Sequence, residues 1–457
     1  MFVQEFQAVV LAGGRGTRLP ELSSGESIKC LLHIGPFPLL FYPLHTLQQH
    51  GFQDAIVIVL ETQKNEIQEA LERTPLKLKI DFATIPGDTD FGTADSLRSI
   101  SDKIKTDIIV VSCDIITNAS LFPVVNKFRQ HNAAIACLLF SGGIDSDVTV
   151  PGPKSKNKAE RDLICINPDS NRLLFCASTS DFEETMDING HLMRKNEKME
   201  VYSRLIDSHI YIMRKWIIDF LQKKENISTI KGELIPYIVK KQMCKNLQAP
   251  KDAQSEVNHN IKPENDIFNF IPTNILDEKV RDVSLFNDSK LNEPYDGDLI
   301  RCYALIAPKT SMGIRINTTL NYFAINQKLA SLWEKIFNDK DLYKLISNNA
   351  EVKSTQIKDI AIADYAKLSE KTSLTNSIFG PSCVVNPKTI ITNTIIMSHA
   401  IIEEGCKILN SIVCSHARVK KGTTLKSCLI GPNFVVEEES DHEKVHLTNA
   451  DGFMEIE

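Results

Sequence analysis

The chain has 457 residues, a formal net charge of -6 and a pI near 6.0, and 42% of its residues are hydrophobic. This length exceeds what one hydrophobic core usually organises, so we expect two or three domains. The acidic balance argues against a general binder of nucleic-acid backbones, and we expect no direct nucleic-acid partner. No apolar run approaches the ~20 residues of a membrane span, and the N-terminus lacks a secretion signal. The 11 scattered cysteines have no zinc-ligand spacing, which favours a reduced, cytosolic protein without membrane attachment.

Residues 1–244 are expected to form an α/β domain. Short apolar runs alternate with amphipathic stretches from about residue 6 to residue 141. We expect strands near residues 7–12, 55–60, 78–85, 107–114 and 133–140, and helices near 39–51 and 63–74. This βαβα order predicts a doubly wound, mostly parallel sheet with helices on both faces. Ligands of such sheets bind beyond the carboxyl ends of the strands.

The next zone, residues 245–292, has too few apolar residues to fold alone. We expect a flexible polar linker or insertion, with weak docking at the segment IFNFI, residues 267–271. A connecting strand and helix are expected in residues 293–350. A β-helix is expected in residues 351–440, followed by a C-terminal tail at 441–457.

The β-helix prediction depends on a 17-residue repeat that begins at Asn376. Aliphatic or aromatic residues recur at steps of six, six and five. The three columns are Phe379, Ile396, Val413, Ile430; Val385, Ile402, Val419, Val436; and Ile391, Ile408, Leu425. Such spacing gives three flat sides per coil, each with one residue pointing inward, as in a left-handed β-helix of hexapeptide repeats. An ordinary β-sandwich would instead need alternation at period two and closer turn signals.

A glycine-rich loop, AGGRGTR at residues 12–18, follows the first expected strand. Glycines there let backbone N–H groups approach phosphate, because side chains would block the contact. The candidate phosphate-binding residues of this loop are Gly13, Gly14, Gly16, Thr17 and Arg18.

The loop and three later matches resemble the sugar-nucleotide pyrophosphorylases. The matches are Lys29, the GTA sequence that begins at Gly92 and Thr93, and Asp114 at the end of a strand. The resemblance implies that the loop and Lys29 hold the nucleotide phosphates, that the GTA backbone seats the base, and that Asp114 is a magnesium ligand. Fixed amides, a cation and a metal suit nucleotidyl transfer, which spreads negative charge over phosphate oxygens.

Several positions depart from that family. The proline expected before the lysine is Ile28, and the glycine expected before the aspartate is Cys113. The charged sugar-contacting sequences are replaced by NRLLFCASTSD, residues 171–181, and by Ser208 and His209. The phosphate half of the site is thus recognisable and the sugar half is lost. We therefore expect no catalytic residues, no required cofactor, and at most weak binding of GTP or ATP with Mg²⁺ at a vestigial site.

A degenerate pyrophosphorylase domain followed by a hexapeptide coil resembles the gamma subunits of eukaryotic translation initiation factor 2B. The resemblance includes GELIPYIVKKQ, residues 232–242, and the closing DGFMEIE, residues 451–457. It implies a non-catalytic regulatory subunit that pairs with an epsilon subunit, beside alpha, beta and delta subunits. Their complex exchanges GDP for GTP on translation initiation factor 2. The exchange domain of the epsilon family follows its coil, and only about 20 residues follow the last repeat here.

The sequence leaves two enzymatic alternatives open. The first is an active sugar-1-phosphate nucleotidyltransferase, similar to mannose-1-phosphate guanylyltransferases. The second is acyl transfer, because His399 and His416 stand 17 residues apart in adjacent expected coils and hexapeptide acyltransferases often use a histidine base.

Overall fold

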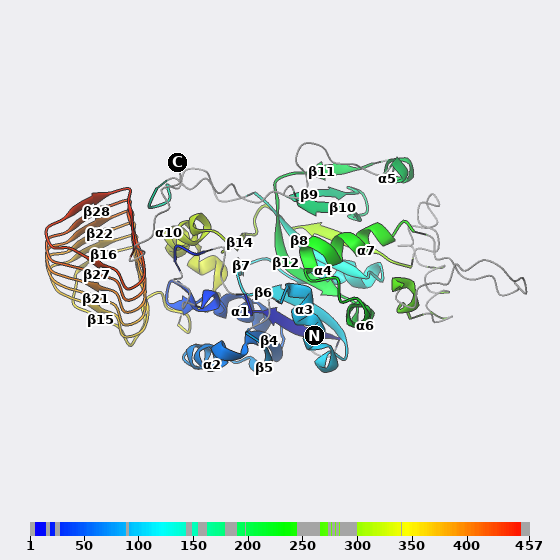
Figure 1. Cartoon of the computed structure of the whole chain (residues 1–457), viewed down its shortest axis with the longest axis horizontal. Helices are drawn as coiled ribbons and strands as arrows, with labels where there is room; N and C mark the ends of the chain where they lie inside the picture. Colours follow the sequence, from blue (N-terminus) through cyan, green and yellow to red (C-terminus); the bar gives the residue numbers. More distant parts are fainter. Residues whose placement is uncertain are drawn as a thin grey trace, which may run out of the picture.

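The computed structural model describes residues 5–14, 19–22, 28–87, 91–142, 149–153, 162–178, 190–196, 198–244, 266–272, 276, 279, 283, 299–339 and 341–448. An α/β domain forms one end of the elongated molecule and a β-solenoid forms the other (Figure 1). None of the helices in the described ranges has both the length and the apolar character that a bilayer span requires.

Seven strands form the main sheet of the α/β domain, in the order β13-β8-β12-β6-β1-β4-β5. They are β1 (Phe6–Leu11), β4 (Asp54–Leu60), β5 (Lys79–Ile85), β6 (Asp107–Ser112), β8 (Ile135–Ser141), β12 (Leu205–Met213) and β13 (Cys302–Ile306). Neighbouring strands are parallel except where β12 pairs with β6 and β8. The expected mostly parallel sheet is confirmed.

Helices cover both faces of this sheet. On one face lie α1 (Phe41–Gln49), α2 (Lys64–Glu72) and α4 (Phe122–Gln130); on the other lie α3 (Thr93–Ser99), α6 (Lys215–Lys223) and α7 (Ile235–Lys241). Successive side chains of a strand point to opposite faces, so Val9 joins one core and Val10 joins the other, each 0% exposed. This burial on both faces explains why the strands read as continuous apolar runs.

Smaller elements surround the sheet. A three-stranded sheet contains β9 (Asp162–Ile166), β10 (Leu173–Ser178) and β11 (Glu200–Tyr202), and α5 (Gly190–Lys195) lies between β10 and β11 in the chain. Short pairs are β2 (His33–Ile34) with β3 (Phe37–Pro38), and β7 (Ile115–Thr117) with β14 (Gly313–Arg315). Single turns of helix are η1 (Lys29–Leu31), η2 (Glu61–Gln63), η3 (Ser101–Lys103), η5 (Ile230–Leu234) and η6 (Ile267–Asn269).

The strand of the segment expected to connect the domains belongs to the α/β domain itself. This strand, β13, pairs in parallel with β8 and forms an edge of the main sheet. Within the expected linker, η6 docks on the α/β domain, where Ile267 is 0% exposed and Phe268 is 9% exposed. Residues 245–265 and most of 273–298 lie outside the described residues.

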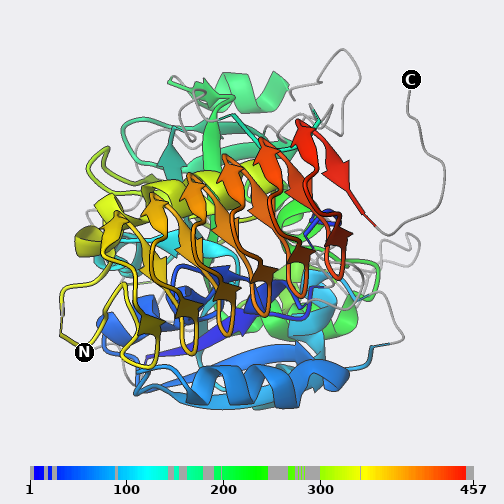
Figure 2. The same cartoon turned by 90° about the vertical axis from the view of Figure 1, so that its left-hand side faces the viewer.

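The solenoid has three sheets of six parallel strands each. The β15 sheet contains β15 (Glu351–Val352), β18 (Lys367–Leu368), β21 (Val384–Val385), β24 (Ile401–Ile402), β27 (Arg418–Val419) and β30 (Val435–Val436). The β16 sheet contains β16 (Gln356–Lys358), β19 (Ser373–Thr375), β22 (Ile390–Thr392), β25 (Lys407–Leu409), β28 (Thr424–Lys426) and β31 (Asp441–Glu443). The β17 sheet contains β17 (Ala361–Ile362), β20 (Ile378–Phe379), β23 (Ile395–Ile396), β26 (Ile412–Val413), β29 (Leu429–Ile430) and β32 (His446–Leu447). Strands of successive coils stack directly on one another (Figure 2).

The inward columns named from the sequence form the solenoid core. Each of their members is 0% or 1% exposed. Corner residues such as Asn376, Asn393 and Asn410 have positive φ angles, which Asn tolerates better than most residues. The left-handed β-helix prediction is confirmed. The strands continue to residue 447, beyond the expected end at 440. This last coil was not expected because its inward residue after Leu425 is His442, which breaks the aliphatic column.

One solenoid face docks on the rest of the molecule. Ile395 and Ile412, two outward side chains of the β17 sheet, are at most 2% exposed. They share a core with residues of the α/β domain and of α10 (Thr319–Ile336), including Trp333. Because these aliphatic side chains would otherwise face water, their burial attaches the solenoid to the α/β domain.

Candidate functional site

The strand order of the main sheet reverses between β1 and β6, which are direct neighbours. Ligands of open α/β sheets bind beyond the strand ends at such a point. Gly13 and Gly14 follow β1, and Asp114 follows β6, so these candidate residues come to the same edge of the sheet. A Cβ atom on Gly13 would lie 2.8 Å from Ile85 Cδ1, so a side chain at that position would require Ile85 to shift. The candidates Gly16, Thr17 and Arg18 lie outside the described residues.

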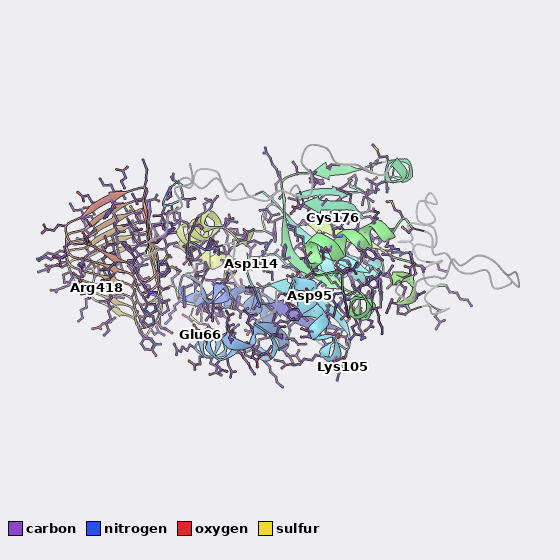
Figure 3. The ribbon with its side chains drawn as sticks, viewed as in Figure 1. Glu66, Asp95, Lys105, Asp114, Cys176 and Arg418 are labelled. Carbon is purple, nitrogen blue, oxygen red and sulfur yellow. The ribbon has the colours of Figure 1, made fainter. Side chains whose placement is uncertain are left out.

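Asp114 is 2% exposed, and its carboxylate contacts three side chains. Ser112 Oγ donates to Oδ1 at 2.7 Å, and Lys29 Nζ lies 2.7 Å from Oδ2. The guanidinium of Arg315 binds both oxygens, from Nε to Oδ1 at 3.2 Å and from Nη2 to Oδ2 at 3.1 Å. Figure 3 shows Asp114 in the middle of the molecule, within the α/β domain. Both carboxylate oxygens are therefore held by cationic side chains of the chain itself.

These contacts determine the charge state of the carboxyl group. Burial alone would raise the pKa of Asp114, but the charges of Arg315 and Lys29 outweigh burial and hold this pKa well below its usual value. Burial would likewise lower the pKa of Arg315, yet the Asp114 carboxylate raises it overall. Asp114 is thus ionised at neutral pH and is balanced by two positive charges.

The two cations reach Asp114 from distant parts of the sequence. Lys29, in η1, is 85 residues from Asp114 and was expected at the site. Arg315 is 201 residues away, at the end of β14, and the sequence analysis did not identify it. β14 pairs with β7, which begins directly after Asp114, and Ile316 N donates to Asp114 O at 2.8 Å. No local motif marks Arg315, because its role comes from this pairing.

Ser208 and His209 take different roles at a bulge in β12. Ser208 Oγ donates to the carbonyl of Leu138 at 2.6 Å and accepts from Ile210 N, so it holds the bulge together. His209 has a positive φ of 52°, and its Nε2 lies 2.9 Å from Arg315 Nη1. Arg315 therefore lies between the carboxylate of Asp114 and the imidazole of His209.

A cavity of about 300 Å³ adjoins His209. The charged side chains among its described lining residues are Asp162, Asp207 and Lys231. Lys231 Nζ pairs with Asp162 Oδ2 at 2.8 Å, and burial raises the pKa of Asp207. Two acidic groups face one lysine, which gives no excess positive charge for a sugar phosphate.

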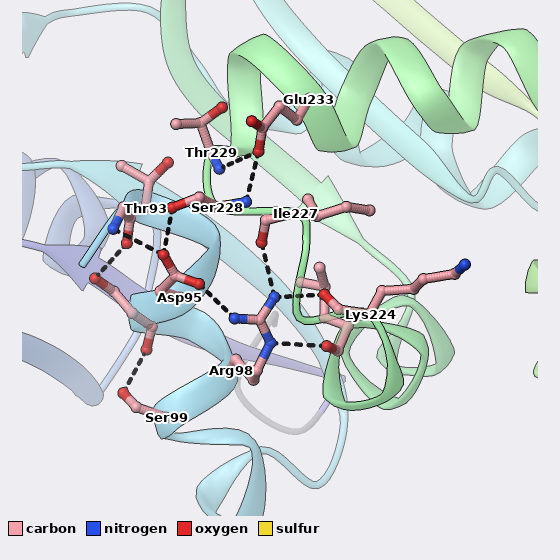
Figure 4. Close-up of polar contacts among 12 residues, drawn as sticks. Thr93, Asp95, Arg98, Ser99, Lys224, Ile227, Ser228, Thr229 and Glu233 are labelled. Atoms are coloured by element: carbon pink, nitrogen blue, oxygen red, sulfur yellow. Dashed lines mark hydrogen bonds and ion pairs between the residues drawn. The ribbon is translucent and has the colours of Figure 1, made fainter. Parts of the chain in front are cut away.

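The GTA sequence bonds to the segment that precedes η5 (Figure 4). Ala94 N donates to the carbonyl of Ser228 at 2.8 Å, and Ile230 N donates to Thr93 Oγ1 at 2.9 Å. A Cβ atom on Gly92 would lie 2.1 Å from Ser228 O, so glycine is required there by close packing. The first two residues of α3 thus form hydrogen bonds with the protein's own backbone.

Arg98 strengthens the same contact from the end of α3. Its guanidinium donates to the carbonyls of Leu221 at 2.8 Å, Lys224 at 2.6 Å and Ile227 at 2.7 Å, and it also pairs with Asp95. This network joins α3 to the end of α6 and the loop that follows it (Figure 4).

The surroundings of Asp114 do not fit a divalent cation. Magnesium prefers carboxylate and water oxygens, but both Asp114 oxygens already accept from Arg315, and one also from Lys29. Across the residues that the structure describes, no group of three or more His, Cys, Asp or Glu side chains could hold a metal ion.

The solenoid histidines lie at corners of adjacent coils. The rings of His399 and His416 stack with centroids 4.8 Å apart and planes 8° apart. Burial and the neighbouring ring lower the pKa of His399. His399 and His416 line a groove of about 900 Å³ between the solenoid corners and α2. The coil repeat itself places one ring over the other.

Known proteins match both halves of the chain. A nucleotidyl transferase family model matches residues 7–148, and a GlmU-like C-terminal hexapeptide model matches residues 344–446. Translation initiation factor eIF2B subunit gamma of Schizosaccharomyces pombe is 31% identical over 335 residues, which are 72% of this chain and 66% of that protein. The Caenorhabditis elegans subunit is 31% identical over 250 residues, 52% of this chain and 59% of the relative. The Dictyostelium discoideum subunit is 24% identical over 414 residues, 83% of this chain and 88% of the relative.

The chain thus covers 66% and 59% of the lengths of the first two relatives. All three relatives carry the same name, and the two family models correspond to the α/β domain and the solenoid described above. The chain belongs to the family of translation initiation factor eIF2B gamma subunits.

Proposed function

We propose that this chain is a non-catalytic regulatory and scaffold subunit of the exchange factor that promotes GDP–GTP exchange on eukaryotic translation initiation factor 2. Membership of the gamma family supports the assignment to that complex. The single observation that carries the non-catalytic role is the buried Asp114, whose carboxylate is bound by Lys29 and Arg315.

Nucleotidyl transfer needs groups that stabilise negative charge on the phosphates. In this cleft the charged side chains instead pair with one another. In such reactions a metal ion and fixed donors neutralise charge that develops on phosphate oxygens. Removing one such donor costs roughly a hundredfold or more in rate. Here Asp114 pairs with two cations of the chain itself, Ala94 N of the GTA sequence donates to Ser228 O, and the Thr93 hydroxyl accepts from Ile230 N. The proposed function therefore requires no metal ion and no nucleotide in this cleft.

A scaffold needs exposed faces for partner chains, and the solenoid has them. Exposed outward side chains of the β15 and β16 sheets include Ile401 at 37%, Val435 at 46% and Ile390 at 43%. Exposed apolar positions on a rigid face suit a protein partner. We propose that an epsilon subunit binds the chain first and that alpha, beta and delta subunits complete a cytosolic complex. Translation initiation factor 2 is the proposed substrate protein.

The test is purification of the tagged chain from cytosol, followed by an exchange assay. We expect an epsilon-type subunit and then the other subunits to co-purify. Release of labelled GDP from initiation factor 2 should be slower with the epsilon subunit alone than with the pair. If the chain is recovered alone, or if the pair and epsilon alone release GDP at equal rates, the proposal is wrong.

A second candidate function is sugar-1-phosphate nucleotidyl transfer. It is favoured by the nucleotidyl transferase match and by Gly13 and Gly14 at the strand end. The ion-paired Asp114 opposes it.

A further inference from the structure

Arg315 occupies a position between two groups that commonly bind metals. Its guanidinium contacts both carboxylate oxygens of Asp114, and its Nη1 atom lies 2.9 Å from His209 Nε2. Carboxylate and imidazole groups are ligands for manganese, cobalt and related divalent ions. The guanidinium thus fills the space toward which these potential ligands point. It supplies the positive charge that a metal ion would otherwise supply.

The same residue starts the chain segment that leads to the solenoid. Arg315 ends β14, and Ile316 N donates to the backbone carbonyl of Asp114 at 2.8 Å. Asn321, in the first turn of α10, donates through Nδ2 to Arg315 O at 2.8 Å. Thr318 caps that turn by accepting from Asn321 N. Arg315 is therefore tied to Asp114 by its side chain and to α10 by its backbone.

The helix α10 carries these contacts on to the solenoid. Leu329 and Trp333 of α10 share one buried core with Ile395 and Ile412 on the outward face of the β17 sheet. Tyr322 OH also donates to His33 O at 3.1 Å in the α/β domain. A continuous set of packed groups thus joins the cleft aspartate to the docked solenoid face.

We propose that Arg315 is a built-in replacement for a divalent cation at Asp114, and that the Asp114–Arg315 ion pair anchors α10 and the solenoid to the α/β domain. Binding of a divalent cation at Asp114 and docking of the solenoid then exclude each other, because both need the same carboxylate. This inference concerns the chain by itself and holds whether or not the chain serves an exchange factor.

The experiment uses the full chain with Arg315→Met, which removes the charge and keeps an unbranched side chain. Arg214→Met is the matched control, because Arg214 Nη1 pairs with Asp107 Oδ2 at 2.7 Å at the opposite end of β6. Mn²⁺ binding is followed by electron paramagnetic resonance, and hydrogen exchange is followed in α10 and the β17 sheet. We expect at least tenfold tighter Mn²⁺ binding and at least tenfold faster exchange in Arg315→Met. The wild type and Arg214→Met should show neither change.

Every other outcome contradicts part of the proposal. Mn²⁺ binding by the wild type that Asp114→Asn abolishes would show that Arg315 does not replace the cation. A folded Arg315→Met variant that does not bind Mn²⁺ would overturn the claim that Arg315 replaces a cation. A folded variant with unchanged hydrogen exchange would overturn the claim that the ion pair anchors the solenoid. If Arg315→Met does not fold, Arg315→Lys becomes the decisive variant. It keeps the charge, so it should show the hydrogen exchange of the wild type and should not bind Mn²⁺. Failure on either count rejects the proposal.

Discussion

The docked face of the solenoid gives a prediction whose size follows from burial. Ile412 is 0% exposed and lies in a column with Ile395 and Leu429, against the core shared with α10. Ile412→Ala removes buried methyl groups and leaves a cavity between two rigid elements, which typically costs about 2–5 kcal/mol of unfolding free energy. Ile401 is the matched control, because it is also an outward solenoid isoleucine but is 37% exposed. Ile401→Ala should change stability by only about 0.5 kcal/mol.

The assay is urea unfolding of the two variants and the wild type, followed by circular dichroism. Ile412→Ala should lower the midpoint of the transition that includes the solenoid, and limited proteolysis should cut the variant faster between the domains. Both variants remove the same side-chain atoms, so their difference isolates the docked environment. Equal losses in the two variants would refute the claim that the β17 sheet is an internal face.

Three further predictions concern the cleft and the coil. Asp114→Asn should lower the unfolding free energy by about 3–5 kcal/mol at pH 7, because it breaks a buried ion pair. Since the folded-state pKa of Asp114 lies below the unfolded value of about 3.9, this stabilisation is full above that pH and is lost as the pH falls further, so acid titration of stability should bring variant and wild type together. Gly92→Ala would place a Cβ atom 2.1 Å from Ser228 O and should lower the thermal midpoint by an amount that corresponds to about 1–3 kcal/mol. Val413→Asp buries an unpaired carboxylate at a position that is 0% exposed, so the coil should lose its circular dichroism signal; a native spectrum would contradict the inward assignment.

The regular parts of this fold could be predicted because their signals are local or periodic. Strands of the main sheet are buried on both faces, so they appear in the sequence as unbroken apolar runs such as residues 108–111. Each solenoid coil repeats the environment of the preceding coil, so the inward residue recurs at a fixed spacing. His442 interrupts that column, which explains why the final coil could not be recognised.

The parts that could not be predicted depend on contacts between distant residues. Asp114 and Arg315 are 201 positions apart, and only the pairing of β14 with β7 brings them together. In the sequence, the docked outward residues of the β17 sheet cannot be distinguished from the exposed outward Ile401. Both kinds of residue stand next to inward aliphatic residues. Lys29 was expected from its motif, but its pairing with Asp114 was not, since a motif specifies residue types and gives no partner.

The central claim is that the cleft balances its own charges and no longer transfers nucleotides. The most direct test incubates the purified chain with GTP or ATP, Mg²⁺ and a sugar 1-phosphate such as mannose 1-phosphate, and measures pyrophosphate release. The account predicts no release above the rate of a matched Asp114→Asn sample. Release at a few turnovers per second, lost in that variant, would show an active nucleotidyltransferase and contradict the account.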